Sequence, residues 1–523
     1  MKSDEVLVID LFAGPGGLGE GVSSVRTSDG NYPFKIGVSV EREVTAHRTL
    51  TTRAFFRKIR ENKSARSDYY EYVKGMISRE ELFALYPVES EAAIHETLEA
   101  PRELGKENKL IHERIKTLSA AHKGKKMVIG GPPCQAYSLA GRSRNAGIKN
   151  YVAEEDHRHF LYKEYLQVLS IVQPDVFVME NVRGILSAKL NGELMFPSIL
   201  EDLRNPGKAA GNDESTDASH GYKIYSLVKE ADDPQNPQYS KFSDFLIQSE
   251  KYNIPQARHR VILLGVRDDI KAIPGTLTEN ITSVFSVENL LADLPELRSG
   301  FSKKPDSRQE WEQVITENSK YLKKILLNNS YSEKQVANLN LKPYPDMERK
   351  STRFAGNHRS CQIPEPLKSW LIDRELNYVL NHETRGHMEA DLLRYAFCAV
   401  YAQLNGGVSP KSKDFPEELA PEHANWKTGT HADRFRVQSA AKYSTTVTSH
   451  ISKDGHYFIH YDPKQCRSLT VREAARLQTF PDNYFFEGNR TQQYVQVGNA
   501  VPPYLAQQIG KVVMALLALS YSG

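Results

Sequence analysis

Residues 6–19 read VLVIDLFAGPGGLG, and this stretch decides the fold class. The near-continuous apolar run from Val6 to Phe12 is typical of a parallel β-strand covered on both faces. The turn that follows contains glycines at 14, 16 and 19, and Glu41 ends a second apolar run further on. In α/β folds such glycines let the backbone approach a nucleotide-like ligand, and the acid accepts hydrogen bonds from ribose hydroxyl groups. The pattern alone does not distinguish a dinucleotide from S-adenosylmethionine, and a tight turn without a ligand is the alternative interpretation.

Further apolar runs predict more buried strands, with helical patterns between them. The predicted strands cover residues 34–40, 127–129, 176–179 and 261–264, and a helical pattern covers residues 161–172. Strands that alternate with helices indicate a doubly wound α/β sheet.

Three segments interrupt this alternation. Residues 52–125 are charged and mostly helical in pattern, and we interpret them as an insertion. Residues 205–220 are turn formers without core-forming side chains, which predicts a mobile loop. Between residues 271 and 466 the α/β pattern disappears, and all three tryptophans lie there. We therefore expect a second domain in this region.

Composition limits the class of protein. The chain has 523 residues, of which 25% are charged and 40% hydrophobic, as in globular proteins. The net charge is only +3, so nucleic acid would have to bind in a local groove. The four cysteines lie far apart without a CxxC pair, which argues against a disulfide scaffold or structural zinc and favours a reducing compartment. No apolar run approaches the roughly 18 residues of a membrane span, so we expect a soluble, cytoplasmic protein without a membrane partner.

Reactive or charged side chains follow three of the predicted strands, at the sheet edge where ligands bind in open α/β folds. The stiff turn Gly130–Pro133 positions Cys134, a plausible nucleophile, although a small buried apolar residue is the alternative. Glu180 ends an otherwise apolar strand, where a carboxyl group can exchange a proton with a ligand. Strand alternation predicts that Arg258 and Arg260 point to one face and reach the same site.

Together these motifs resemble those of the DNA (cytosine-5) methyltransferases. The chain carries DLFAGPGG, GGPPCQAYS, ENV, QARHR, RSLTVREAARLQTFPD and QVGNAVPP in that family's order. The resemblance implies an α/β, Rossmann-like S-adenosylmethionine-dependent methyltransferase fold with a second, smaller target-recognition domain. It implies a catalytic domain over residues 1–270, a target-recognition domain over 271–466, and a C-terminal segment, 467–523, that completes the catalytic domain.

The resemblance also implies a reaction, the transfer of a methyl group from S-adenosylmethionine to carbon 5 of a cytosine in a specific double-stranded DNA sequence. Cys134 would add to carbon 6 of a flipped-out base, and Glu180 would hydrogen-bond the cytosine ring. Arg260, with Arg258, would bind the base carbonyl or steady the other two groups. An RNA (tRNA) cytosine-5 methyltransferase of the same family is the alternative, and the long recognition segment favours DNA. A dehydrogenase would explain only the glycine turn and Glu41.

The matching motifs imply which residues bind the expected cofactor, S-adenosylmethionine. They are Phe12, Gly14, Gly16, Gly17, Glu41, Pro133, Leu161, Asn499, Ala500 and Val501. In the family, a loop after the cysteine meets DNA, which implies contacts at Gln135, Ser138 and Arg142, with an ordinary solvated loop as the alternative. The family's acid that contacts the adenine amino group is not recognisable in residues 52–125.

The resemblance further implies a prokaryotic monomer that acts on double-stranded DNA, with or without a cognate restriction endonuclease as partner. We expect no metal site. His382 and His387 superficially resemble a zinc motif, but their spacing of five residues would turn them away from each other on a helix. Thr470 and Glu473 predict a capping box at the start of a helix.

Overall fold

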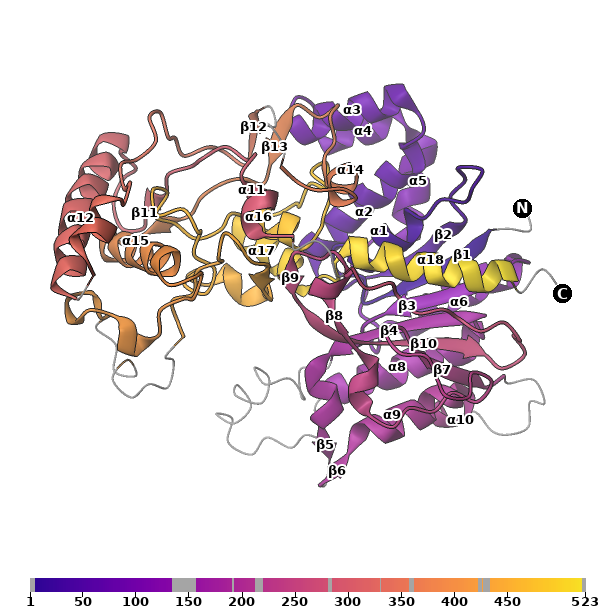
Figure 1. Cartoon of the computed structure of the whole chain (residues 1–523). Helices are drawn as coiled ribbons and strands as arrows, with labels where there is room; N and C mark the ends of the chain where they lie inside the picture. The colour runs from indigo at the N-terminus through magenta and orange to yellow at the C-terminus, as the bar shows by residue number, and fades with distance from the viewer. Residues whose placement is uncertain are drawn as a thin grey trace.

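The computed structural model describes most of the chain, and the statements below apply to that part. The described residues are 5–133, 157–190, 192–211, 220–280, 285–329, 331–356, 362–421, 426 and 433–519. Figure 1 shows a larger lobe built around a sheet and a second lobe that contains α12 and α15.

A seven-stranded sheet forms the centre of the larger lobe, in the order β2-β1-β3-β4-β10-β7 with β8 beside β10. Its strands are β1 (Val6–Leu11), β2 (Phe34–Val40), β3 (Lys126–Gly130), β4 (Val176–Val182), β7 (Tyr222–Ser226), β8 (Leu246–Gln248) and β10 (His259–Arg267). The first four are parallel, and β10 runs antiparallel to β4, β7 and β8. All five predicted strands are confirmed. Because β1 lies between β2 and β3, its carboxyl end is the switch point where such sheets bind ligands.

Alternation along β1 buries both faces of the sheet. Val6 and Val8 point into one core cluster, whereas Leu7, Ile9 and Leu11 point into the other. Helices cover the two faces (Figure 1). They are α1 (Gly17–Ser23) and α18 (Pro503–Leu519) on the first, and α6 (Asn108–Ala121), α8 (His157–Val172) and α9 (Met195–Arg204) on the second. The expected doubly wound α/β architecture is therefore confirmed, with β10 as an antiparallel addition.

The charged segment 52–125 is helical, as the sequence predicts. It contains α3 (Lys63–Lys74), α4 (Arg79–Leu85), α5 (Pro87–Glu96) and α6, and it follows α2 (Val44–Ile59). The helical part begins before residue 52, because the Glu43 side chain caps α2 by accepting a hydrogen bond from the Ala46 amide.

The second lobe has a hydrophobic core of its own. This cluster extends from Phe301 to Cys466 and is centred on α12 (Arg308–Asn328) and α15 (Glu389–Leu404), with Trp311 fully buried. Other parts of residues 271–466 pack instead with the core of the larger lobe. They include α11 (Val287–Leu291), α14 (Leu367–Leu371) and the segment from Val447 to Phe458.

The predicted loop at residues 205–220 is wrong over its first part. Residues Pro206–Ala209 form α10, in which Pro206 and Gly207 are buried and Ala209 packs against the core. A proline at the first position favours such a short helix, because its missing amide would be unpaired there anyway. Residues 212–219 lie outside the described residues.

The remaining elements are short. They are β5 (Lys189–Leu190), β6 (Glu193–Leu194), β9 (Gln256–Ala257), β11 (Gly300–Phe301), α13 (Glu333–Ala337), β12 (Arg353–Ala355), β13 (Tyr378–Leu380), β14 (Gly386–His387), β15 (Ser444–Thr445), α16 (Val471–Leu477), α17 (Arg490–Asn499) and the 3-10 helices η2 (Arg183–Ser187), η3 (Phe242–Phe245), η4 (Ser249–Tyr252), η5 (Ser412–Asp414), η6 (Glu417–Leu419) and η7 (Ser449–Ser452). The predicted capping box of Thr470 and Glu473 begins α16. Across the described ranges, every helix is too short or too polar to cross a lipid bilayer.

Candidate active site

The turn after β1 has glycines where side chains do not fit. Gly14 and Gly16 have φ angles of 58° and 100°, in the region that favours glycine. A Cβ atom on Gly17 would lie 2.3 Å from the backbone oxygen of Val501 and 3.4 Å from the Cβ of Ala500. The structure therefore brings together predicted cofactor residues from opposite ends of the chain.

Glu41 closes this turn from the end of β2. Its carboxylate accepts hydrogen bonds from the amide of Gly14 at 2.8 Å and from the amide of Glu43 at 2.7 Å. Burial raises the pKa of Glu41. Phe12 lies in the same turn with a φ of 56°, a strained conformation for a residue other than glycine. Strain of this kind often marks a ligand site, so the turn fits the predicted role.

Three other predicted cofactor residues differ in exposure. Leu161 is buried on α8, Pro133 is half-buried after β3, and Asn499 is exposed at the end of α17. The remaining residues of the cysteine loop, Cys134, Gln135, Ser138 and Arg142, lie outside the described residues.

Glu180 and Arg260 form an ion pair at the edge of the sheet next to the cysteine turn. Arg260 Nε lies 2.7 Å from Glu180 Oε1, and the two side chains are 13% and 14% exposed. The register of β4 and β10 explains the pair, because Arg260 lies opposite Val182, two residues beyond Glu180 and on the same face. A Cβ on Gly131 would lie 2.7 Å from Glu180 Oε2, so the glycine makes room for the carboxylate.

Asn181 is a site residue that the sequence reasoning missed. Its side-chain amide donates to the carbonyl oxygen of Pro132 at 3.2 Å, and the residue is buried. The asparagine therefore holds the turn that leads to Cys134. Its place in the ENV motif could have identified it, because strand alternation puts Asn181 on the face opposite Glu180.

Arg258 has partners different from those of Arg260. It donates to the backbone oxygens of Val447 at 2.7 Å and Gly498 at 3.2 Å. Burial, followed by the charge of Arg260, lowers the pKa of Arg258 well below its usual range. Arg258 lies in the break between β9 and β10, and its guanidinium still interacts electrostatically with Arg260 and Glu180. Its hydrogen bonds join the QARHR motif to Val447 of the region 271–466 and to Gly498 of the C-terminal segment.

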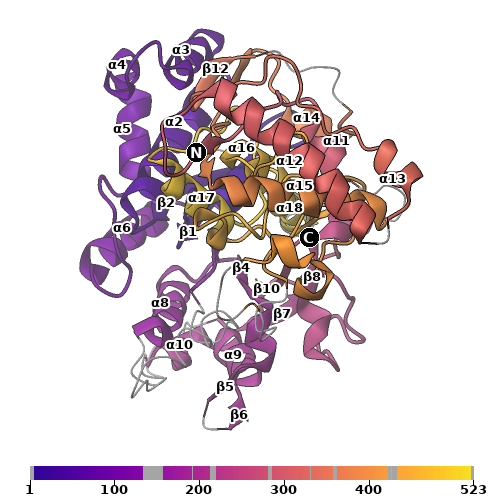
Figure 2. The ribbon, with the colours of Figure 1, turned by 90° about the vertical axis from the view of Figure 1, so that its left-hand side faces the viewer.

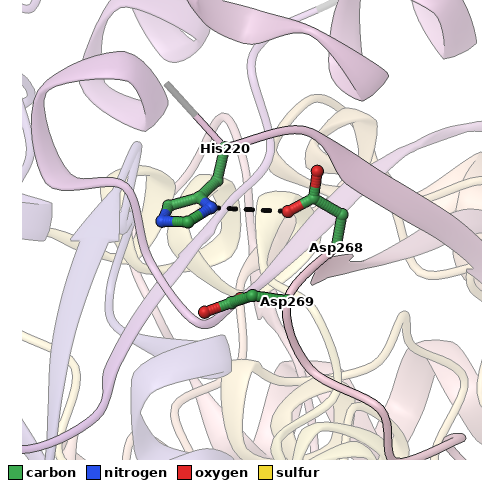
Figure 3. A group of neighbouring side chains, drawn as sticks. All are labelled: His220, Asp268 and Asp269. Carbon is green, nitrogen blue, oxygen red and sulfur yellow. Dashed lines mark ion pairs between the residues drawn. The ribbon is translucent and has the colours of Figure 1, made fainter. Parts of the chain in front are cut away.

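The described part of the chain contains one group with the spacing of metal ligands, and it lies away from this site. Figure 3 shows His220, Asp268 and Asp269, all exposed, with His220 Nδ1 3.5 Å from Asp268 Oδ1. Arg267 donates to both oxygens of Asp269, at 2.7 and 3.1 Å, which already neutralises that carboxylate.

His382 and His387 have protein partners rather than a shared centre. The ring nitrogens of His382 contact Thr470 Oγ1 and the carbonyl oxygen of Pro295, while His387 Nε2 contacts Ser468. Burial lowers the pKa of His382 to about 4.

The fold and site together define the class. A glycine turn at the switch point of a Rossmann-like sheet, with an acid at the end of the next strand, is a site for a nucleotide-like ligand, and it agrees with the S-adenosylmethionine-dependent methyltransferase fold. The model of the C-5 cytosine-specific DNA methylase family matches residues 84–208 and 219–515. The chain therefore belongs to this family, and it is a DNA (cytosine-5) methyltransferase.

Two relatives with similar sequences agree with this assignment. The chain is 32% identical to the type II methyltransferase M.Bpa9945I of Bacillus paralicheniformis, over 97% of this chain and 98% of the relative. It is 26% identical to the type II methyltransferase M1.HphI of Haemophilus parahaemolyticus, over 76% of this chain and 70% of the relative. A solved structure of a putative DNA modification methyltransferase of Escherichia coli has 17% identity and a TM-score of 0.48, with 98% of this chain and all of the other covered.

Proposed function

We propose that the protein transfers a methyl group from S-adenosylmethionine to carbon 5 of a cytosine in a specific double-stranded DNA sequence. The observation that carries this proposal is the ion pair of Glu180 and Arg260, which lies beside the turn that leads to Cys134. The glycine turn that fits the cofactor lies at the end of β1, on the same sheet.

The chemistry explains why these residue types are needed. Carbon 5 of cytosine is a poor nucleophile until a group adds to carbon 6. In the proposed reaction the sulfur of Cys134 forms a bond to carbon 6, and carbon 5 becomes electron-rich. The glycine turn would hold S-adenosylmethionine, whose methyl group would pass to carbon 5 with S-adenosylhomocysteine as the leaving group. Loss of the proton from carbon 5 then lets the bond between sulfur and carbon 6 break, which regenerates Cys134.

Glu180 would stabilise the charge that develops on the ring. Its carboxyl group would hydrogen-bond ring nitrogen 3 and the amino group, while Arg260 fixes its orientation. These contacts need the edge of the base that is paired in a duplex, so the cytosine must be flipped out of the stack. Asn181 would position Cys134 indirectly, through the carbonyl of Pro132.

Residues 271–466, which include the second lobe, would recognise the DNA sequence. The relatives named type II methyltransferases suggest that the modification protects host DNA from a cognate restriction endonuclease. Contacts at Gln135, Ser138 and Arg142 would hold the DNA backbone.

Bisulfite sequencing of DNA from a host that expresses the protein tests the reaction and finds the site together. We expect 5-methylcytosine at one short sequence.

Arg260→Gln should lower kcat by roughly 10²- to 10³-fold, because one charge-stabilising group is removed, and binding of S-adenosylmethionine should persist. Arg267→Gln, at the far end of β10, is the matched control and should leave kcat unchanged. Methylated RNA with unmodified DNA would contradict the proposal.

A further inference from the structure

The helix α3, part of the helical segment 52–125, has no role in the proposed reaction, yet it makes specific contacts with the middle of residues 271–466. Figures 1 and 2 both show α3 beside β12. This helix has 12 residues, or just over three turns, and buries Tyr69, Tyr70, Tyr72 and Val73 along one face. A polar segment therefore contributes a closely packed aromatic surface.

Polar contacts on this face are geometrically specific. Arg66 donates two hydrogen bonds to the carboxylate of Glu375, from Nε and from Nη2, each at 3.0 Å. Tyr70 donates to Asp373 Oδ2 at 2.5 Å. Paired bonds from an arginine fork fix both the distance and the angle of the two groups, more than a single charge contact would.

Apolar packing joins the same segments. One core cluster contains Leu376 and Leu380 of the region 271–466 together with Phe55 and Tyr69 of the helices, and Phe485 of the C-terminal segment. Burial of this cluster opposes any separation of the three parts.

The C-terminal segment is held by the same helix. Tyr69 donates to the backbone oxygen of Asn483 at 3.0 Å, and Tyr72 donates to Glu487 Oε1 at 2.8 Å. Asn483 in turn donates to Asp373 at 2.7 Å, so Asp373 is bonded to both α3 and the C-terminal segment.

The order of the segments along the chain means that these contacts connect the two lobes. The separate core of the second lobe is formed by residues on both sides of the segment 353–380 in the sequence, from Phe301 to Met347 and from Leu392 to Cys466. Its flanking segments pack on the larger lobe near Leu290 and Leu469. The contacts of residues 373–380 with α3 add to the packing of α14 on the core of the larger lobe, so this middle segment is a further link between the lobes.

We propose that α3 is a positioning element for target recognition. It holds residues 373–380 against the larger lobe and thereby fixes the second lobe relative to Glu180 and Arg260. Selectivity among DNA sequences then depends on Arg66 and Glu375, although neither touches the reacting atoms. This inference rests on the proposed reading of DNA by residues 271–466.

Charge reversal provides the test. Arg66→Glu and Glu375→Arg are made singly and together in the full chain, and kcat/KM is compared between a duplex with the methylated site and duplexes with one base pair changed. Each single variant should lower this selectivity ratio at least about threefold, because misplacement by a fraction of an ångström already costs rate at the reacting centre. The double variant should restore the ratio, and affinity for S-adenosylmethionine should be unchanged in all three.

Arg204→Glu is the matched control, since Arg204 pairs with Glu201 at 3.3 Å and is similarly accessible on α9 of the larger lobe. A fall in melting temperature with unchanged selectivity in the single variants would show a purely structural role and overturn the inference. Failure of the double variant to restore selectivity would overturn it as well.

Hydrogen exchange of the wild-type protein with and without the methylated-site duplex separates this inference from the function on which it rests. Protection within residues 301–466 is expected if this region reads DNA. Its absence would overturn the recognition assignment, and the inference with it, whereas protection together with unchanged selectivity in Arg66→Glu would overturn the inference alone.

Discussion

Asp10, in β1, is buried beneath α1, and neither of its carboxyl oxygens has a hydrogen-bond partner among the described residues. Burial raises the pKa of Asp10 to about 8, with Glu96 and Glu41 adding to the rise and Arg57 opposing it. An unfolded aspartate ionises near pH 4, so the folded state binds one proton more between about pH 4 and 8. Stability should therefore fall as the pH rises through this window.

Asp10→Asn should remove this pH dependence, because the amide stays neutral. We expect the variant to gain stability over the wild type between pH 5 and pH 8, by about 1.4 kcal/mol for each unit of pH at most. Thermal melting at the two pH values measures the difference. Asp29→Asn, in an exposed turn, is the control. An equal effect of Asp10→Asn at both pH values would show that Asp10 is ionised in the folded protein.

Gly17 leaves no space for a side chain, and this predicts a defect in cofactor binding. Gly17→Ala would place a methyl group 2.3 Å from the backbone oxygen of Val501, so α1 or the C-terminal segment must move. We expect affinity for S-adenosylmethionine to fall at least about tenfold, as measured by calorimetry, since one tenfold step corresponds to only about 1.4 kcal/mol. Gly30→Ala has open space around it and a φ of 81°, so it should cost about 1–2 kcal/mol in stability and leave affinity unchanged.

Two of the other thiols are unsuited to the role of nucleophile. Burial raises the pKa of Cys398 and of Cys466, so neither forms a reactive thiolate. Cys134→Ser should therefore abolish methyl transfer while binding of S-adenosylmethionine persists, because a hydroxyl group is a far weaker nucleophile. Cys398→Ser and Cys361→Ser should keep most of the turnover. A Cys134→Ser enzyme with near wild-type turnover would remove Cys134 from the mechanism.

At the scale of elements, α16 depends on a buried ion pair. Arg467 donates to both oxygens of Glu473, at 2.8 and 2.7 Å, and both residues are almost fully buried. Burial opposes ionisation of Glu473, but the Arg467 guanidinium outweighs it and lowers the pKa of Glu473. The stabilisation from this carboxylate is therefore present above about pH 4.5 and is lost as the pH falls below that value.

Glu473→Gln should destabilise the protein by about 3–5 kcal/mol, because it leaves the charge of Arg467 buried without its partner. Denaturant unfolding at pH 7 measures this difference. Glu61→Gln breaks an exposed pair with Arg26 and should cost less than about 1 kcal/mol. Similar losses in the two variants would mean that water reaches Arg467 in solution.

The sequence predicts the elements better than it predicts their partners. The strands could be found because residues 6–9 and 176–179 are apolar on both faces, which few other local structures tolerate. The pair of Glu180 and Arg260 follows from strand ends that share one sheet edge. The backbone partners of Arg258 could not be predicted, because Val447 and Gly498 lie far from it in the sequence. The contact of Arg66 with Glu375 joins residues 309 positions apart, and no local pattern encodes it.

At the scale of the whole molecule, charge is nearly balanced but much of it is internally paired. The net charge is +3, and buried arginines such as Arg53 and Arg476 are neutralised by acids within the fold. These cations are not available to DNA. Phosphate contacts must therefore come from cations at the surface that face the bound duplex.

Because phosphates release counterions when protein cations neutralise them, DNA affinity should fall steeply with salt. If about four phosphates are contacted, the association constant should fall roughly tenfold for each doubling of the salt concentration. Titration of a duplex that contains the methylated site, at several salt concentrations, measures the slope. Affinity for S-adenosylmethionine, measured in the same buffers, is the control and should change less than about twofold, since that ligand releases no counterion atmosphere. A DNA slope as shallow as the cofactor's would mean that base contacts, rather than phosphate contacts, supply the binding energy.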